Sequence, residues 1–144
     1  MRDVVVVGAG LHRYGVFPEK NAIELGTVAI QRALDDAGCQ WTDIEALYCG
    51  TVRLGMSAGH NICRHMGTTG LAIANVENAS ASGSSAFREA HLAVAAGEHD
   101  VVLALILWQM RRVAGPRQIP QDVYVALAHM VGAGGVCVIH MLRQ

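Results

Sequence analysis

Residues 72–97 read AIANVENASASGSSAFREAHLAVAAG, and they carry the clearest structural signal in the chain. The short apolar run 72–76 predicts a strand, and the residues from Ser82 onward follow a helical pattern. Gly97 is placed to end that helix in the left-handed conformation that glycine tolerates. Most of the residues 82–96 are Gly, Ser or Ala, so we expect this helix to be buried with other backbones close to it. Ser80 falls at the turn between strand and helix.

The turn at Ser80 has two interpretations. A residue there lies at a helix N-terminus, where backbone N–H groups lack helical partners. Such groups favour an anion and can hold a developing oxyanion, which suits a nucleophile. Serine is also a common helix cap, so Ser80 and Ser82 could have a purely structural role. From residue chemistry alone, the capping interpretation is the stronger one.

Around this stretch, strand-like and helical segments alternate along the chain. Further apolar runs, each predicted to be a strand, cover residues 3–7, 46–52 and 101–108. A helix with one apolar face is predicted over 21–37, and a short one around 61–66. Alternation of this kind predicts a single α/β domain over residues 1–144, with one mostly parallel, layered sheet.

The pattern weakens after residue 110. Residues 110–119 are predicted to form a loop, and Pro120 is placed to open a helix that runs to about Met130. The last apolar segment, 136–143, fits a helix or a strand, and its periodicity does not decide between them.

Composition excludes several classes of protein. Hydrophobic residues make up 52% of the 144 residues and charged residues only 16%, which excludes a disordered chain. So apolar a composition also leads us to expect a surface that binds a partner. Eleven basic against twelve acidic residues argue against nucleic-acid binding. The longest apolar run, 101–108, is too short to span a membrane. The four cysteines contain no CxxC pair, which indicates free thiols in a reducing, cytoplasmic compartment.

Two weaker motifs are interpreted structurally. Gly8 and Gly10 follow a strand, but Arg13 occupies the position of the last glycine in a dinucleotide-binding fingerprint, so we expect an ordinary turn at the strand end. His60, Cys63 and His65 do not share one face of a helix, so no metal site is expected. No bound cofactor is expected either.

The segment VENASASGSSAFREAHLAVAAGEHDVVLAL, residues 76–105, resembles the nucleophile region of the thiolases. The similarity is to the branch with the sterol-carrier-protein thiolases and the lipid-transfer-protein-like enzymes, and it covers about residues 1–110. It implies a thiolase-like half-fold with a buried small-residue helix. It also implies an acyl-CoA thioester as substrate, with formation or cleavage of a carbon–carbon bond. Ser80 stands where the family has its nucleophilic cysteine, so impaired or non-thiolytic chemistry is expected.

A second similarity lies near the C-terminus. Residues 128–135, AHMVGAGG, resemble the GHPxGAxG loop of the thiolases, and 136–144 resemble the helix that follows it. By this resemblance His129 is the histidine that activates the nucleophile, and 120–144 are a remnant of the histidine loop and its helix. The family chain is more than twice as long, so a shortened thiolase-like protein is expected.

Two classes of function remain open. The first is a thiolase-like acyltransferase or an aldolase-type subunit that works with a small OB-fold partner. The second is a non-catalytic binding or assembly subunit. In the family, the second half of the chain covers the helix corresponding to 82–96, so we expect a homo-oligomer or a partner protein here.

Overall fold

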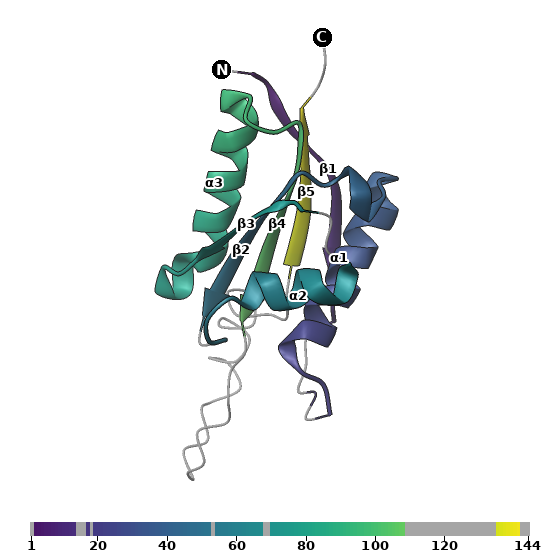
Figure 1. Cartoon of the computed structure of the whole chain (residues 1–144), viewed down its shortest axis with the longest axis vertical. Helices are drawn as coiled ribbons and strands as arrows, with labels where there is room; N and C mark the ends of the chain where they lie inside the picture. The colour runs from purple at the N-terminus through teal and green to yellow at the C-terminus, as the bar shows by residue number, and fades with distance from the viewer. Residues whose placement is uncertain are drawn as a thin grey trace.

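The computed structural model describes residues 2–13, 17, 19–52, 54–67, 70–108 and 135–141. Its elements, shown in Figure 1, are β1 (Val4–Leu11), α1 (Ala22–Ala37), η1 (Trp41–Asp43), β2 (Ala46–Val52), α2 (Ala58–Met66), β3 (Ala72–Val76), η2 (Ala79–Ala81), α3 (Ser82–Ala96), β4 (Val101–Trp108) and β5 (Gly135–Met141).

The strands form one sheet in the order β1-β5-β4-β2-β3. Strand β2 pairs in parallel with both β3 and β4, whereas β5 pairs antiparallel with both β1 and β4. Of the five strands that the structure describes, four therefore run in one direction and β5 is reversed. The predicted α/β fold with a mostly parallel sheet is confirmed, and all four predicted strands are present.

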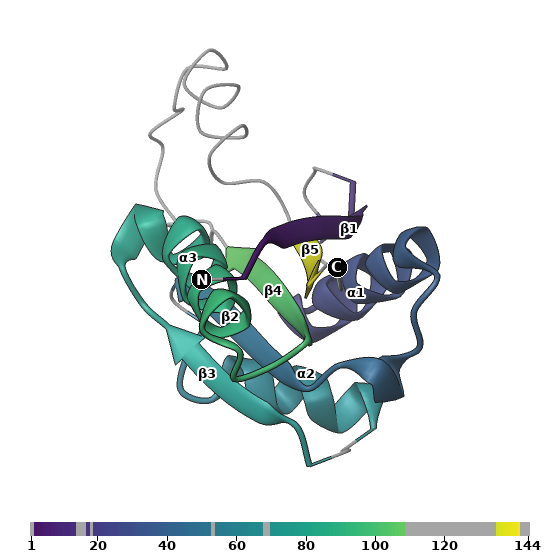
Figure 2. The ribbon, with the colours of Figure 1, turned by 90° about the horizontal axis from the view of Figure 1, so that it is seen from above.

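Helices cover the sheet on both faces, which gives three layers (Figure 2). Helices α1 and α2 lie on one face and α3 lies on the other. Two apolar clusters fill the spaces between the layers, one beside α1 and α2 and one beside α3. Ala86, Ala90 and Val94 of α3 are fully buried, which confirms that the small-residue helix packs closely.

Gly8 and Gly10 lie inside β1 rather than in a turn at its end, so the turn predicted there is wrong. A Cβ atom on Gly8 would lie 2.6 Å from the carbonyl oxygen of Ala33, and one on Gly10 would collide with the carbonyl oxygen of Ala29. Both glycines therefore allow α1 to approach the strand closely, and they serve packing.

The segment left open between helix and strand is the strand β5. The helix implied over 136–144 by the second resemblance is therefore wrong for residues 136–141. Pairing decides the conformation, because β5 is inserted between β1 and β4 and bonds to both. The loop predicted over 110–119 and the helix predicted over 120–130 lie outside the described residues.

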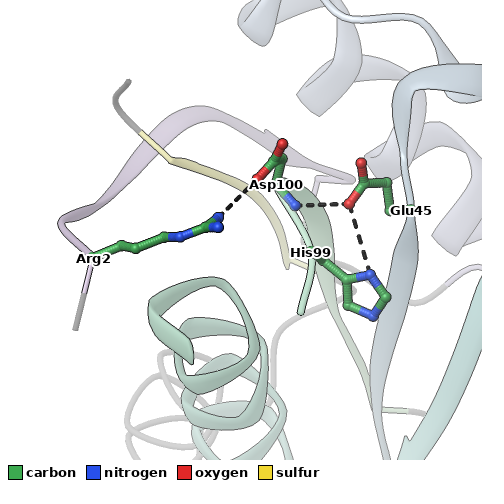
Figure 3. Close-up of polar contacts among 4 residues, drawn as sticks. All are labelled: Arg2, Glu45, His99 and Asp100. Carbon is green, nitrogen blue, oxygen red and sulfur yellow. Dashed lines mark hydrogen bonds and ion pairs between the residues drawn. The ribbon is translucent and has the colours of Figure 1, made fainter. Parts of the chain in front are cut away.

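A group of polar side chains joins the ends of several elements at the edge where β2 and β4 begin (Figure 3). Arg2 Nη1 lies 2.9 Å from Asp100 Oδ1, and the Asp100 backbone N–H donates to Glu45 Oε2 at 2.7 Å. His99 Nδ1 lies 3.7 Å from the same Glu45 oxygen. These partly exposed contacts hold the N-terminus against the α3–β4 connection, and each contributes about 1 kcal/mol or less.

Within the described residues, no helix has the length and apolar character needed to cross a membrane. The same residues contain no group of three or more His, Cys, Asp or Glu side chains that could hold a metal ion.

Candidate active site at the β3–α3 elbow

The sharp connection between β3 and α3, which we call the elbow, comprises residues 77–81. It lies at the edge of the sheet where the parallel strands β2, β3 and β4 end, the usual position of ligand sites in open α/β sheets. Ser80 is exposed and belongs to the short helix η2. It lines a cavity of about 230 Å³ together with Gly50, Val52, Ser82, Gly83, Ser84, Ile106 and Leu107.

Neither serine of the elbow region caps α3. The N-cap residue is Ala81, and no side chain accepts a hydrogen bond there. Ser82 is already the first helical residue, and its hydroxyl reaches back to residues 78 and 79. The capping interpretation of Ser80 and Ser82 is therefore wrong for this helix.

Ala79, the residue before Ser80, has a strained backbone, as does Ser57 outside the elbow. Ala79 has φ +44°, in the left-handed region that costs a residue with a Cβ atom about 1–2 kcal/mol. Its N–H donates to Glu77 Oε1 at 2.8 Å, and its carbonyl accepts from Ser82 Oγ at 2.9 Å. Ser82 Oγ also accepts from the Asn78 N–H at 2.7 Å. These bonds hold Ala79 in its strained conformation, and such strain often occurs at functional sites.

Two glycines bring the strands against the first turn of α3. A Cβ atom on Gly50 of β2 would lie 2.5 Å from the Ser82 carbonyl oxygen. One on Gly83 would lie 2.7 Å from Ile106 Cγ2 on β4. Neither Gly50 nor Ile106 is predicted as a site residue from the sequence alone. Their only signal is a position at the end of a predicted strand.

Two of the native thiols are buried and unreactive. Burial raises the pKa of Cys49 to about 12, with a smaller contribution from the nearby Cys63. Burial also raises the pKa of Cys63 to about 11. The thiolate is the nucleophilic form of cysteine, so neither residue replaces the cysteine that the family has at position 80.

His129, the predicted partner of Ser80, lies outside the described residues. The pairing of Ser80 with His129 therefore stays a prediction. Within the described part of the chain, no imidazole or carboxylate side chain is hydrogen-bonded to Ser80 Oγ.

Comparison with known proteins identifies the fold and the family. Acetyl-CoA acetyltransferase of Methanothermobacter thermautotrophicus is 34% identical over 121 residues, which cover 81% of this chain and 32% of that protein. Sterol carrier protein 2 of Gallus gallus is 36% identical over 108 residues, which cover 72% of this chain and 20% of that protein. The chain thus spans about a third or less of the length of these relatives.

Solved structures share the fold at low sequence identity. A priming β-ketosynthase of a polyketide pathway superimposes with a TM-score of 0.77 at 17% identity, covering 98% of this chain and 51% of that one. A cysteine-to-serine variant of OleA from Xanthomonas campestris, solved with bound lauric acid and lauroyl-CoA, superimposes with a TM-score of 0.72 at 16% identity. It covers 97% of this chain and 57% of that one.

The family model described as "Thiolase, N-terminal domain" matches residues 4–122, which include the whole elbow and the cavity beside it. The resemblance predicted from residues 76–105 is thereby confirmed. The chain belongs to the thiolase family.

Proposed function

We propose that this chain binds an acyl-CoA thioester with the acyl group beside Ser80, and that Ser80 does not support thiolytic acyl transfer. The observation that carries the proposal is the serine itself, exposed on a strained elbow and facing a cavity at the end of the parallel strands. Two relatives, an acetyl-CoA acetyltransferase and a sterol carrier protein, support an acyl-CoA or lipid ligand by their names.

The cavity suits the acyl end of such a ligand. Its lining combines the apolar residues Val52, Ile106 and Leu107 with the serines Ser80, Ser82 and Ser84. At about 230 Å³ it is smaller than the roughly 300–1,000 Å³ of pockets that enclose a whole drug-sized ligand. We therefore propose that only the acyl group and the thioester enter it.

Replacement of a thiol by a hydroxyl explains the proposed loss of thiolysis. A helix N-terminus can lower the pKa of a thiol from about 8.5 into the physiological range, so that it ionises without a bound base. A serine hydroxyl does not ionise in this way, and it needs a base held against it to become a nucleophile. His129 is the candidate for that base by resemblance, and its pairing with Ser80 is untested.

The same serine favours a second candidate, a binding or assembly subunit without chemistry of its own, or an aldolase-type subunit that needs an OB-fold partner. Exposed apolar side chains support an association surface, since Val6 is 50% exposed, Leu11 42% and Met56 93%. A homo-oligomer or a heteromeric partner would cover them. Acyl-CoA cleavage that appears only after a partner is added would favour an aldolase-type subunit over an enzyme that is active as the isolated chain.

A thermal-shift titration with acetyl-CoA tests the binding proposal, because a ligand that binds only the native state stabilises it. At 100 times the Kd, the stabilisation is about 2.7 kcal/mol. The variant Ser80→Phe fills the cavity and should lose the shift. Gln31→Phe places the same bulky residue on the exposed surface of α1 and should keep it. No shift in the wild-type protein at millimolar acetyl-CoA, or an equal shift in both variants, would contradict the proposal.

A further inference from the structure

We propose that Ser82 and Glu77 are positioning residues that clamp Ala79 and thereby aim residue 80 at the cavity. The inference rests on the proposed function in one respect, that residue 80 is the one that faces the acyl group. Neither Ser82 nor Glu77 needs to touch the ligand.

The clamp holds both polar groups of one strained residue. Glu77 Oε1 accepts the Ala79 N–H at 2.8 Å, and the Ser82 hydroxyl donates to the Ala79 carbonyl at 2.9 Å. The Ser82 backbone N–H donates to the same carbonyl. An alanine at φ +44° tends to return to a negative φ, and these contacts oppose that change.

Ser82 is the central member of the clamp. It is only 2% exposed, and its hydroxyl is satisfied in both directions, as donor to Ala79 and as acceptor from the Asn78 N–H at 2.7 Å. A buried hydroxyl is costly unless it is hydrogen-bonded. Since Ser82 does not cap α3, bracing the elbow accounts for a serine at this buried position.

The position of Ser80 follows from these bonds. The Ala81 N–H donates to the Asn78 carbonyl at 2.8 Å, so residues 78–81 form a closed turn with Ala79 and Ser80 at its centre. If Ala79 leaves its left-handed conformation, the next peptide plane turns and the side chain of residue 80 leaves the cavity. The clamp therefore controls the direction of residue 80 without contacting its side chain.

A thiol introduced by Ser80→Cys reports on the elbow without any acyl-CoA. We expect it to be labelled quickly by iodoacetamide at neutral pH, because the N-terminus of α3 lowers its pKa. Adding Ser82→Ala should slow labelling about tenfold and raise the apparent pKa from the pH profile by about one unit, toward the ordinary 8.5. Ser82→Thr retains the hydroxyl and should restore labelling to within about threefold of the Ser80→Cys parent. Peptide mapping separates residue 80 from the native thiols.

Two variants of the exposed Glu77 provide a test that does not depend on a buried site. In the same Ser80→Cys background, Glu77→Gln removes the charge and keeps an oxygen acceptor for Ala79, whereas Glu77→Ala removes both. The charge effect is therefore equal in the two variants. We expect labelling at least about threefold slower with alanine than with glutamine.

Equal labelling in Glu77→Gln and Glu77→Ala would overturn the role of Glu77. Labelling unchanged by Ser82→Ala in a protein of native circular dichroism would overturn the role of Ser82. If Ser82→Ala fails to fold, the Glu77 pair decides whether Ala79 is clamped. Acetyl-CoA binding is measured separately on the wild-type protein, so the clamp and the proposed function can fail independently.

Discussion

The substitution Gly50→Ala perturbs the elbow from the sheet side, and its effect can be worked out from the structure. The added Cβ atom would lie 2.5 Å from the carbonyl oxygen of Ser82, 2.8 Å from its carbonyl carbon and 3.0 Å from the Gly83 Cα atom. All three neighbours are backbone atoms, so no side chain can rotate away. Restoring an ordinary contact of about 3.4 Å requires the first turn of α3 to move about 0.9 Å from β2.

The cost of that movement is the cost of overpacking a close contact, about 1–3 kcal/mol. For a chain of this length, we expect the Tm to fall by roughly 3–12 °C. The displaced turn carries Ser82 and the elbow with it, so acetyl-CoA binding should weaken together with stability. Differential scanning calorimetry measures the first effect, and titration calorimetry below the Tm measures the second.

Gly26→Ala is the matched control, with the same chemical change on α1. Its Cβ atom would meet only the side-chain ends of Leu107 and Ile62, at 3.2 and 3.3 Å. Alanine also favours a helix over glycine by about 1 kcal/mol. We expect a Tm close to the wild-type value or above it. A Gly50→Ala protein with wild-type Tm and wild-type acetyl-CoA affinity would refute the close packing of β2 against the elbow.

Three further predictions concern other contacts. Gly83→Ala should destabilise the protein by about 1–2 kcal/mol in chemical denaturation, because its Cβ would lie 2.7 Å from Ile106 Cγ2 and 2.8 Å from Ile106 Cγ1, and it should cost less in an Ile106→Ala background, which lacks both atoms; additive effects would argue against this contact. Raising the pH from about 9 to 11 should lower the free energy of unfolding, since the buried Cys49 has its pKa raised to about 12 and the unfolded chain loses that proton first. Cys49→Ala should reduce this pH dependence, and an identical pH slope would count against burial of the thiol. Arg2→Ala should change the free energy of unfolding by about 1 kcal/mol or less, because its pairing with Asp100 is solvent-exposed, and a larger loss would show that the contact is more than a surface ion pair.

Local patterns were sufficient to predict most of the fold. The apolar runs 46–52, 72–76 and 101–108 form β2, β3 and β4 over the predicted ranges, and α1 ends at Ala37 as expected; Gly38 is its left-handed cap. The position of Ser80 between strand and helix was also predicted. These features depend on residues that are neighbours in the sequence, which is why periodicity and turn chemistry reveal them.

The missed features depend on contacts between distant segments. Strand β5 is specified by two neighbours far away in the sequence, so its own short apolar pattern fitted a helix equally well. Gly8 and Gly10 looked like a turn because the approach of α1 is not visible in a local pattern. The left-handed Ala79 has no sequence signal of its own, since the conformation is imposed by Ser82 and Glu77.

The most direct test of an acyl site at the elbow is peptide mapping by mass spectrometry after incubation with acetyl-CoA, on the wild-type protein and on Ser80→Cys. We expect no acyl group on residue 80 of the wild type, because a hydroxyl is a weaker nucleophile than a thiol and no imidazole or carboxylate of the described residues is hydrogen-bonded to it. We expect acylation of residue 80 in Ser80→Cys, where the elbow supplies an ionised thiol next to the cavity. Acylation of Ser80 in the wild type, or an unmodified residue 80 in Ser80→Cys, would contradict the proposal that the elbow is an acyl site at which serine cannot react.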